Sequence, residues 1–206
     1  MSKLINTWNT IAIILLSSCL FSCKDNDSPK PASSNSSLAT TTVKNLPADP
    51  DSKNQYTFFS FKNNSIIDRT DSATVNWDIG FKTTTIIVNG GTSGPGIGAA
   101  LVYTGIFSDL TSAPSSGYTT DNSAIVPPNA IPTGSGNGWY NYNSTDHVIS
   151  AIPGRVLVFR TAQGKYAKVE IISYYKDAPI NPTSADIARY YTFRYMYQDD
   201  GSKNFQ

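Results

Sequence analysis

The sequence predicts an all-β protein with a single domain and little helix. From Tyr56 onward, short apolar runs alternate with Gly, Pro, Asn and Asp, which is the spacing of strands and turns. Aromatic residues make up 12% of the chain and charged residues only 15%, a balance that suits the half-buried surface of a strand. No segment shows a long 3.6-residue apolar period between helix caps. We therefore expect mostly antiparallel strands.

The first 22 residues have the layout of an export signal, with Lys3 as the positive end. The apolar core Ile11–Leu16 is too short to span a bilayer, which takes about 20 residues. Cys19 and Cys23 each follow a serine, as a lipid-bearing cysteine does. We place the lipid at Cys23, because the polar run Lys24–Asp27 follows it, whereas lipidation at Cys19 would leave Cys23 as a free thiol. The alternative is an ordinary signal peptide with incidental cysteines.

Residues 23–53 are expected to be the lipidated cysteine and a flexible polar tether. They are rich in Ser, Pro, Asn, Thr and Lys, and such a segment cannot bury enough apolar surface to offset its ordering entropy. The expected organisation is a signal peptide over 1–22, the tether over 23–53 and a β domain over 54–206. The tether would let the domain stand away from the membrane, and the Asp-rich run Lys24–Asp27 favours export to the cell surface.

The first half of the domain holds four expected strands. Val75–Phe81 alternates, which places Val75, Trp77, Ile79 and Phe81 on one face. Gly90–Gly98 superficially suggests a phosphate loop, but a strand follows it where a phosphate loop needs a helix, so we interpret it as a bend. The four strands are Tyr56–Phe61, Val75–Phe81, Thr83–Val88 and Ala99–Tyr103.

The second half begins with a long loop, residues 111–137, and ends in three strands. Arg155–Thr161 and Tyr166–Tyr175 flank Ala162–Lys165, which predicts a tight hairpin. The last strand, Arg189–Tyr197, carries Tyr191, Phe193, Tyr195 and Tyr197 on one side. Its other side carries Tyr190, Thr192, Arg194 and Met196. Short helical turns are conceivable only at Thr183–Ala188 or Phe107–Leu110.

Few residues are suited to catalysis or to metal binding. His147 is the only histidine, and a neutral imidazole is a good ligand for iron, although a lone His in a turn is more often a surface residue. Met196 is the only methionine outside the signal peptide, and filling a gap in the core is its expected role. No nucleophile elbow or His-Glu metal motif is present, so we expect no enzyme. The net charge of +1 gives no reason to expect nucleic acid as a partner.

Aromatic residues cluster in the second half of the chain. Their faces could stack on sugars or on a planar macrocycle, and the alternative is that they are ordinary core residues. The set comprises Trp139, Tyr140, Tyr142, Tyr174, Tyr175, Tyr190 and Tyr191.

Several blocks, in the same order, resemble the HmuY-like haem-binding lipoproteins of the Bacteroidetes. The similarity runs from about Tyr56 to Tyr197, and a lipid-bearing cysteine at the start of the mature chain also fits. The blocks are Tyr56–Phe61, Asn76–Asp78, Asn89–Ala100, Gly117–Thr119, Gly138–Tyr140, Arg155–Arg160, Ala167–Val169 and Thr192–Tyr195.

The resemblance implies an all-β sandwich of sheets that captures haem and hands it to a TonB-dependent outer-membrane receptor. In that family, His or Met pairs on two loops grip the iron. The residues equivalent to the first loop, 120–137, contain neither His nor Met. The second region contains His147, eight residues after Trp139.

We therefore expect haem or another porphyrin as the ligand, with His147 as the axial ligand of the iron. Trp139, Tyr140 and Tyr142 would pack on the ring. Ligation by Tyr, or packing without a strong axial bond, is also chemically possible. Two alternatives are a glycan-binding lipoprotein that uses exposed aromatics and a receptor accessory protein with no small ligand.

Overall fold

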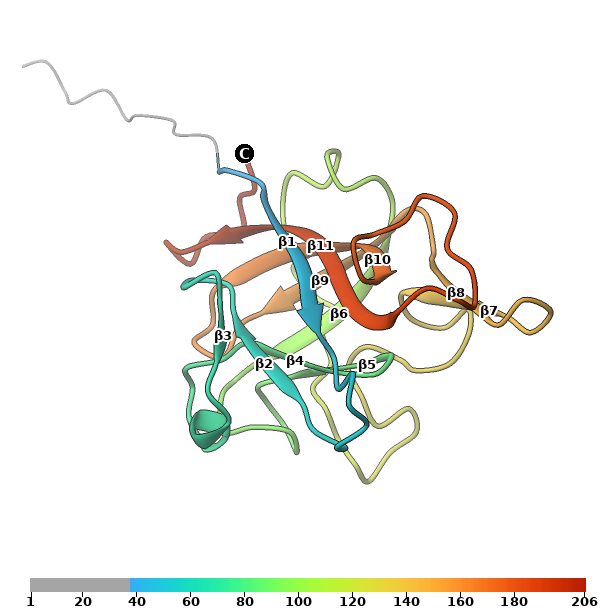
Figure 1. Ribbon diagram of the computed structural model, residues 1–206. Coiled ribbons are helices and arrows are strands. Elements are labelled where there is room, and N and C mark those ends of the chain that lie inside the picture. The colour runs from blue at the N-terminus through green and yellow to red at the C-terminus, as the bar shows by residue number, and fades with distance from the viewer. Residues whose placement is uncertain (1–37) are drawn as a thin grey trace, which may run out of the picture. The chain divides into compact units, whose positions relative to one another are not determined.

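The computed structural model describes residues 38–206, and these form an all-β domain, as predicted (Figure 1). Within that part of the chain, the single helical element is the 3₁₀ turn η1, Arg69–Ala73. None of its segments is a helix long and apolar enough to cross a membrane. The strands are β1 (Thr41–Pro47), β2 (Thr57–Ser60), β3 (Ser65–Ile67), β4 (Ile79–Lys82), β5 (Thr85–Val88), β6 (Ala99–Thr104), β7 (Tyr140–Asn143), β8 (Val148–Ala151), β9 (Arg155–Arg160), β10 (Tyr166–Tyr175) and β11 (Ala188–Gln198).

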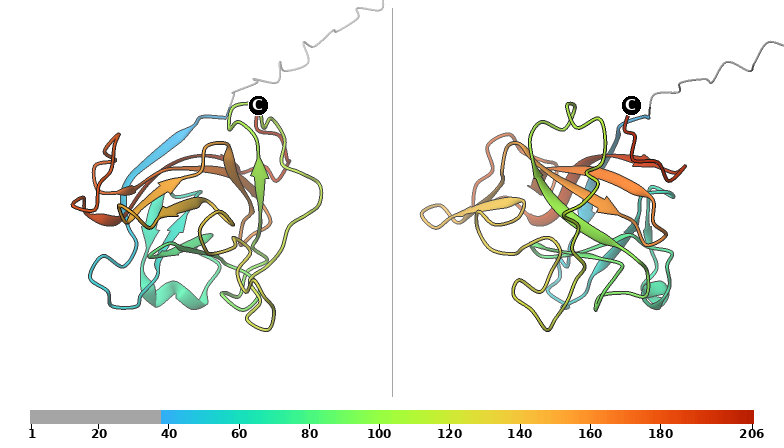
Figure 2. Two further views of the ribbon diagram at one scale, coloured as in Figure 1. Left: turned by 90° about the vertical axis from the view of Figure 1, so that its right-hand side faces the viewer. Right: turned by 180° about the vertical axis from the view of Figure 1, so that it is seen from behind.

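The strands form three sheets in which every neighbouring pair is antiparallel. The five-stranded sheet has the order β1-β11-β10-β9-β6, and the four-stranded sheet has the order β3-β2-β4-β5. The third sheet is the hairpin β7–β8, which projects from one side of the other two (Figures 1 and 2). The long loop before β7 runs near the same side, so the loop and the hairpin are neighbours.

The main core lies between the two larger sheets and is largely aromatic. Phe59 of β2 contacts Phe193 of β11 edge to face, with ring centroids 5.5 Å apart. Phe81 of β4 contacts Tyr191 of β11, with ring centroids 4.8 Å apart. The predicted face of the last strand is therefore confirmed, because Tyr191, Phe193 and Tyr195 are all buried. This packing between inner faces is that of a β-sandwich.

A smaller core lies on the other face of the five-stranded sheet. Met196 is buried there against Phe107, Leu110 and Phe205, so it fills space in the interior as expected. The ammonium group of Lys168 is buried in the same place and donates hydrogen bonds to the carbonyls of Phe107 and Leu110, at 2.7 and 2.8 Å. This second core fixes the start of the long loop to the sheet.

The expectation of a flexible tether up to residue 53 is wrong for part of that range. Thr41–Pro47 forms β1, which pairs with β11 at the edge of the five-stranded sheet. An edge strand needs little apolar surface, because the backbone hydrogen bonds of one ladder hold it and Leu46 alone is fully buried. The polar composition of residues 41–47 therefore gave no sequence signal for β1. Residues 1–37, including the expected signal peptide, Cys19 and Cys23, lie outside the described residues.

Other elements differ from the prediction at their ends. Val75 is 40% exposed, and the strand expected to start there begins only at Ile79. Both expected helical turns are hydrogen-bonded turns without a helix, and β3, β7 and β8 were not predicted. The hairpin at Ala162–Lys165 and the bend at Gly90–Gly98 are confirmed.

Candidate functional site

The hairpin β7–β8 carries the only histidine of the sequence at its tip. The Asp146 carboxylate closes the turn by accepting hydrogen bonds from the backbone N–H of Val148, at 3.0 Å, and from the Asn143 amide, at 2.9 Å. His147 has a φ of 58°, in the left-handed region that favours glycine. A glycine would suit this position better, so the conformation gives no structural reason for the imidazole. Its side chain is exposed.

His147 and Tyr142 form a pair on the surface of this hairpin. The Tyr142 hydroxyl lies 2.6 Å from Nδ1 of His147, and Tyr142 is 44% exposed. When Nδ1 carries the proton and donates it to the Tyr142 oxygen, Nε2 keeps its lone pair free. A hydrogen bond of this kind fixes the ring and the tautomer of a histidine that binds a metal. The pair therefore fits the axial ligation of an iron from one side.

Trp139 and Tyr140, both expected to pack on the ligand, are buried and do not lie beside His147 on the exposed surface. Trp139 is 1% exposed, and its indole N–H donates to the carbonyl of Thr84 at 3.0 Å. Tyr140 is also buried, and its hydroxyl accepts from the backbone N–H of Gly134 at 3.2 Å. Both side chains support the base of the hairpin from within the core.

The rest of the aromatic set is mostly core as well. Tyr174, Tyr175 and Tyr191 are buried, and Tyr190 is half-buried. Burial raises the pKa of Tyr174 to about 12, and it raises the pKa of Tyr191 well above its usual value of 10.0. The exposed aromatic platform that a glycan would need is therefore not formed by these residues.

The long loop lies against the hairpin and is held at its start by a buried carboxylate. Asp121 accepts hydrogen bonds from the backbone N–H of Val88, at 2.9 Å, and of Ala130, at 2.7 Å. Burial raises the pKa of Asp121. Near its end, the Ser135 hydroxyl accepts from the backbone N–H of Tyr142 at 2.8 Å. This hydrogen bond ties the end of the long loop to β7.

The tip of the long loop presents apolar surface. Val126 is 95% exposed and lies at a hollow of about 510 Å³. Neither His147 nor Tyr142 lines this hollow. Its lining residues are Val126, Pro127, Pro128, Pro132, Thr133 and Asn137.

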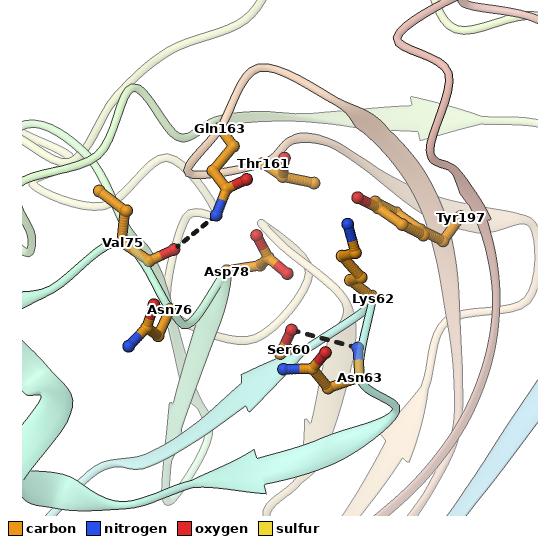
Figure 3. Close-up of a pocket in the computed structure, with 9 residues that line it drawn as sticks. All are labelled: Ser60, Lys62, Asn63, Val75, Asn76, Asp78, Thr161, Gln163 and Tyr197. Atoms are coloured by element: carbon orange, nitrogen blue, oxygen red, sulfur yellow. Dashed lines mark hydrogen bonds between the residues drawn. The ribbon is translucent and has the colours of Figure 1, made fainter.

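A second, polar hollow of about 70 Å³ lies away from the hairpin, with Asp78 in its middle (Figure 3). Asp78 is 8% exposed, and its carboxylate accepts from the backbone N–H of Phe61, at 2.9 Å, and of Ala162, at 3.3 Å. Burial raises the pKa of Asp78 to about 6. Sequence reasoning missed this site, since only the tertiary structure reveals that Asp78 is buried.

The described residues contain no group of three or more His, Cys, Asp or Glu side chains that could hold a metal ion by themselves. A haem needs only one or two axial ligands from the protein, because the porphyrin supplies the others. His147 fits that requirement from one side, while residues 120–137 offer no second His or Met.

Comparisons with known proteins agree with this architecture. The family model described as HmuY protein matches residues 52–195. A solved structure of a HmuY-like heme-binding protein from Bacteroides vulgatus is 19% identical, with a TM-score of 0.52 over 78% of this chain and 93% of that one. The apo form of a HmuY analogue from Tannerella forsythia is 14% identical, with a TM-score of 0.52 over 78% of this chain and 95% of that one.

A lipoprotein of Bacteroides fragilis is 16% identical to this chain, with a TM-score of 0.52 over 79% of this chain and 91% of that one. No curated protein matches the sequence. At these identities the solved structures establish the fold. The family model covers well over half of the chain, and the chain therefore belongs to the HmuY protein family.

Proposed function

We propose that this protein is a surface-anchored lipoprotein that captures haem or a related porphyrin and passes it to a TonB-dependent outer-membrane receptor. It is a binding protein and not an enzyme. The observation that carries the proposal is the exposed His147, held by Tyr142 on a hairpin beside the long loop, in a chain of the HmuY family. The heme-binding description of the Bacteroides vulgatus neighbour supports the same ligand.

His147 is the residue proposed to hold the iron. Its Nε2 binds from one side, while Nδ1 donates to the Tyr142 oxygen 2.6 Å away. This hydrogen bond positions the ring and makes the imidazole a better donor to the metal. Haem supplies the iron and the planar macrocycle. Besides binding the iron, the protein must shield the macrocycle from water.

The long loop is the element proposed to cover the macrocycle. Its tip carries the apolar hollow with Val126, and its end is tied to β7 through Ser135. Apolar walls with a few placed polar groups are typical of cofactor sites. Because 120–137 contains neither His nor Met, this loop contributes packing and not a second axial bond.

Lipidation at Cys23 and a position at the cell surface are part of the same proposal. The Bacteroides fragilis neighbour is described as a lipoprotein. A single axial ligand on an exposed hairpin is suited to release as well as capture, since only one protein–iron bond must break during transfer to a receptor. Haem transfer from the loaded protein to a membrane fraction containing the receptor would test this step.

A haem titration of residues 24–206, oxidised and reduced, tests the ligand. The wild-type protein is expected to give a saturable one-to-one Soret shift that His147→Ala abolishes. Tyr142→Phe, the matched control, keeps the ring but loses the hydrogen bond, and we expect it to bind more weakly with the same stoichiometry.

Two results would contradict the proposed site or function. A Soret shift unchanged in His147→Ala would move the ligand to a tyrosine, to Met196 or to packing alone. No shift with wild-type protein would refute haem capture, and co-purification with an outer-membrane receptor would then favour the accessory role.

A further inference from the structure

The polar hollow around Asp78 is built by three turns that are far apart in the sequence (Figure 3). Lys62 and Asn63 come from the β2–β3 turn, Asn76 precedes β4, and Gln163 comes from the β9–β10 turn. The Gln163 amide donates to the carbonyl of Val75 at 3.5 Å, which bridges two of these turns. The hollow is therefore a product of the folded sandwich and lies outside the β7–β8 hairpin.

Asp78 offers unused acceptor positions to this hollow. An ionised carboxylate has about four lone-pair positions, and the described residues supply only two hydrogen bonds, from Phe61 and Ala162. Among residues 38–206, no Lys, Arg or His side chain forms an ion pair within 4.0 Å of the Asp78 carboxylate. Lys62 is on the rim, but its ammonium pairs with Asp199 at 3.7 Å. A buried carboxylate without a counter-charge is stabilised by a ligand that donates hydrogen bonds to its free acceptor positions.

The rest of the lining can both donate and accept hydrogen bonds. The amides of Asn63, Asn76 and Gln163 each carry an N–H₂ and a carbonyl oxygen, and all three residues are exposed. Ser60 and Thr161, which carry hydroxyl groups, also line the hollow. A ligand hydroxyl likewise donates and accepts, so this lining matches pairs of hydroxyl groups.

Two features exclude other ligand classes. The hollow of about 70 Å³ has room for only a few water-sized groups, which is too small for a macrocycle. A hard metal ion wants six or more oxygen ligands and usually several carboxylates, whereas the hollow has one carboxylate and the Lys62 ammonium at its rim. The ring of Tyr197 forms one side and gives an aromatic face for C–H groups.

We propose that this hollow is a second binding site, which takes two neighbouring hydroxyl groups at the edge of a sugar ring. Asp78 accepts hydrogen bonds from these hydroxyl groups, the amides complete the hydrogen bonds, and the remainder of the sugar lies outside the hollow over Tyr197. The site does not depend on haem binding, because none of its residues belongs to the hairpin or the long loop.

Saturation-transfer difference NMR and calorimetry on the full chain in detergent test this proposal. The probes are methyl glycosides of glucose, galactose, mannose, fucose and N-acetylglucosamine, with methylammonium chloride as the cationic comparison. At least one glycoside is expected to bind saturably at millimolar concentration. Asn76→Ala and Gln163→Ala, both at exposed positions, are expected to weaken that binding at least fivefold.

Gln206→Ala, an exposed residue outside the hollow, is the matched control and should leave glycoside binding unchanged. His147→Ala should also leave it unchanged, which separates this site from the haem site. Asp78→Asn should abolish binding while circular dichroism shows a folded chain. The absence of saturable binding by any glycoside, binding that survives both amide variants, or binding of methylammonium alone would each overturn the proposal.

Discussion

The hairpin with His147 and the hollow with Asp78 are built in opposite ways. Neighbours in sequence hold the hairpin: Asp146 closes its turn, and Tyr142 lies five residues before His147. The Asp78 carboxylate instead joins segments that are 17 and 84 residues away. One site is exposed and locally encoded, and the other is buried and formed by long-range packing.

Because of this difference, substitutions at the two sites should affect the free energy of unfolding to different extents. A side chain at the hairpin tip can change with little effect on the free energy of unfolding, since surface substitutions usually cost less than about 0.5 kcal/mol. A change at a buried polar group disturbs the framework itself. A branch of the family could therefore change its ligand residues while keeping its fold. Substitutions at the two sites and in the core, together with a change of pH, test this contrast.

Trp139→Ala should cause the largest loss of stability. The residue stands immediately before the hairpin, yet its ring is buried against Tyr191, and deleting such a ring costs about 3–5 kcal/mol. Urea unfolding followed by fluorescence measures the loss. Tyr142→Ala, three residues further along, should change the free energy of unfolding by less than about 0.5 kcal/mol. Equal effects of the two substitutions would break the contrast between core and hairpin.

Asp121→Ala should cost about 3 kcal/mol, because it leaves the backbone N–H groups of Val88 and Ala130 buried without acceptors. The same change should release the start of the long loop, which limited proteolysis within 120–137 would detect. Asp146→Ala, which removes an exposed carboxylate, is the control. Unchanged protease resistance in the Asp121 variant would show that other contacts fix the loop.

Stability should rise as the pH falls below 7, through the Asp78 carboxyl. Burial raises its folded pKa to about 6, above the usual value of 3.8, so the folded state binds the proton more tightly than the unfolded state. The stabilisation is complete below 3.8 and is lost as the pH rises through about 6. The gain between pH 7 and pH 5 should be about 1 kcal/mol.

Thermal unfolding of wild-type protein and Asp78→Asn at both pH values measures the gain. The variant should lose most of the difference, whereas His147→Ala should retain it. An identical pH dependence in wild-type protein and Asp78→Asn would assign the effect to another group, with Asp121 as the first candidate because burial raises its pKa too.

His147→Gly should have the smallest effect on stability and a complete effect on haem ligation. Glycine adopts the φ of 58° without strain, so the free energy of unfolding should change by less than about 0.5 kcal/mol. The Soret shift should disappear, as in His147→Ala. A large loss of stability in the glycine variant would show that the imidazole supports the hairpin, and would weaken its assignment as a ligand.

Part of the fold could be predicted because strand periodicity is a local property. The alternation along Arg189–Tyr197 correctly placed Tyr191, Phe193 and Tyr195 together on the face of β11 that packs in the main core. The prediction failed for Thr41–Pro47, where the backbone ladder to β11 and not apolar burial holds the strand. The burial of Trp139 could not be predicted either, since no local pattern distinguishes a ring that stacks on a ligand from one that packs in the core.

The sequence by itself determined the all-β class, the family and the one histidine available to an iron. These follow from residue type, order and period, which the chain carries before it folds. Tertiary structure alone decided that Tyr142 and not Trp139 lies beside His147, and that Asp78 is buried among three distant turns. Burial and hydrogen-bond partnership depend on which segments pack together, and strand periodicity does not specify those pairings.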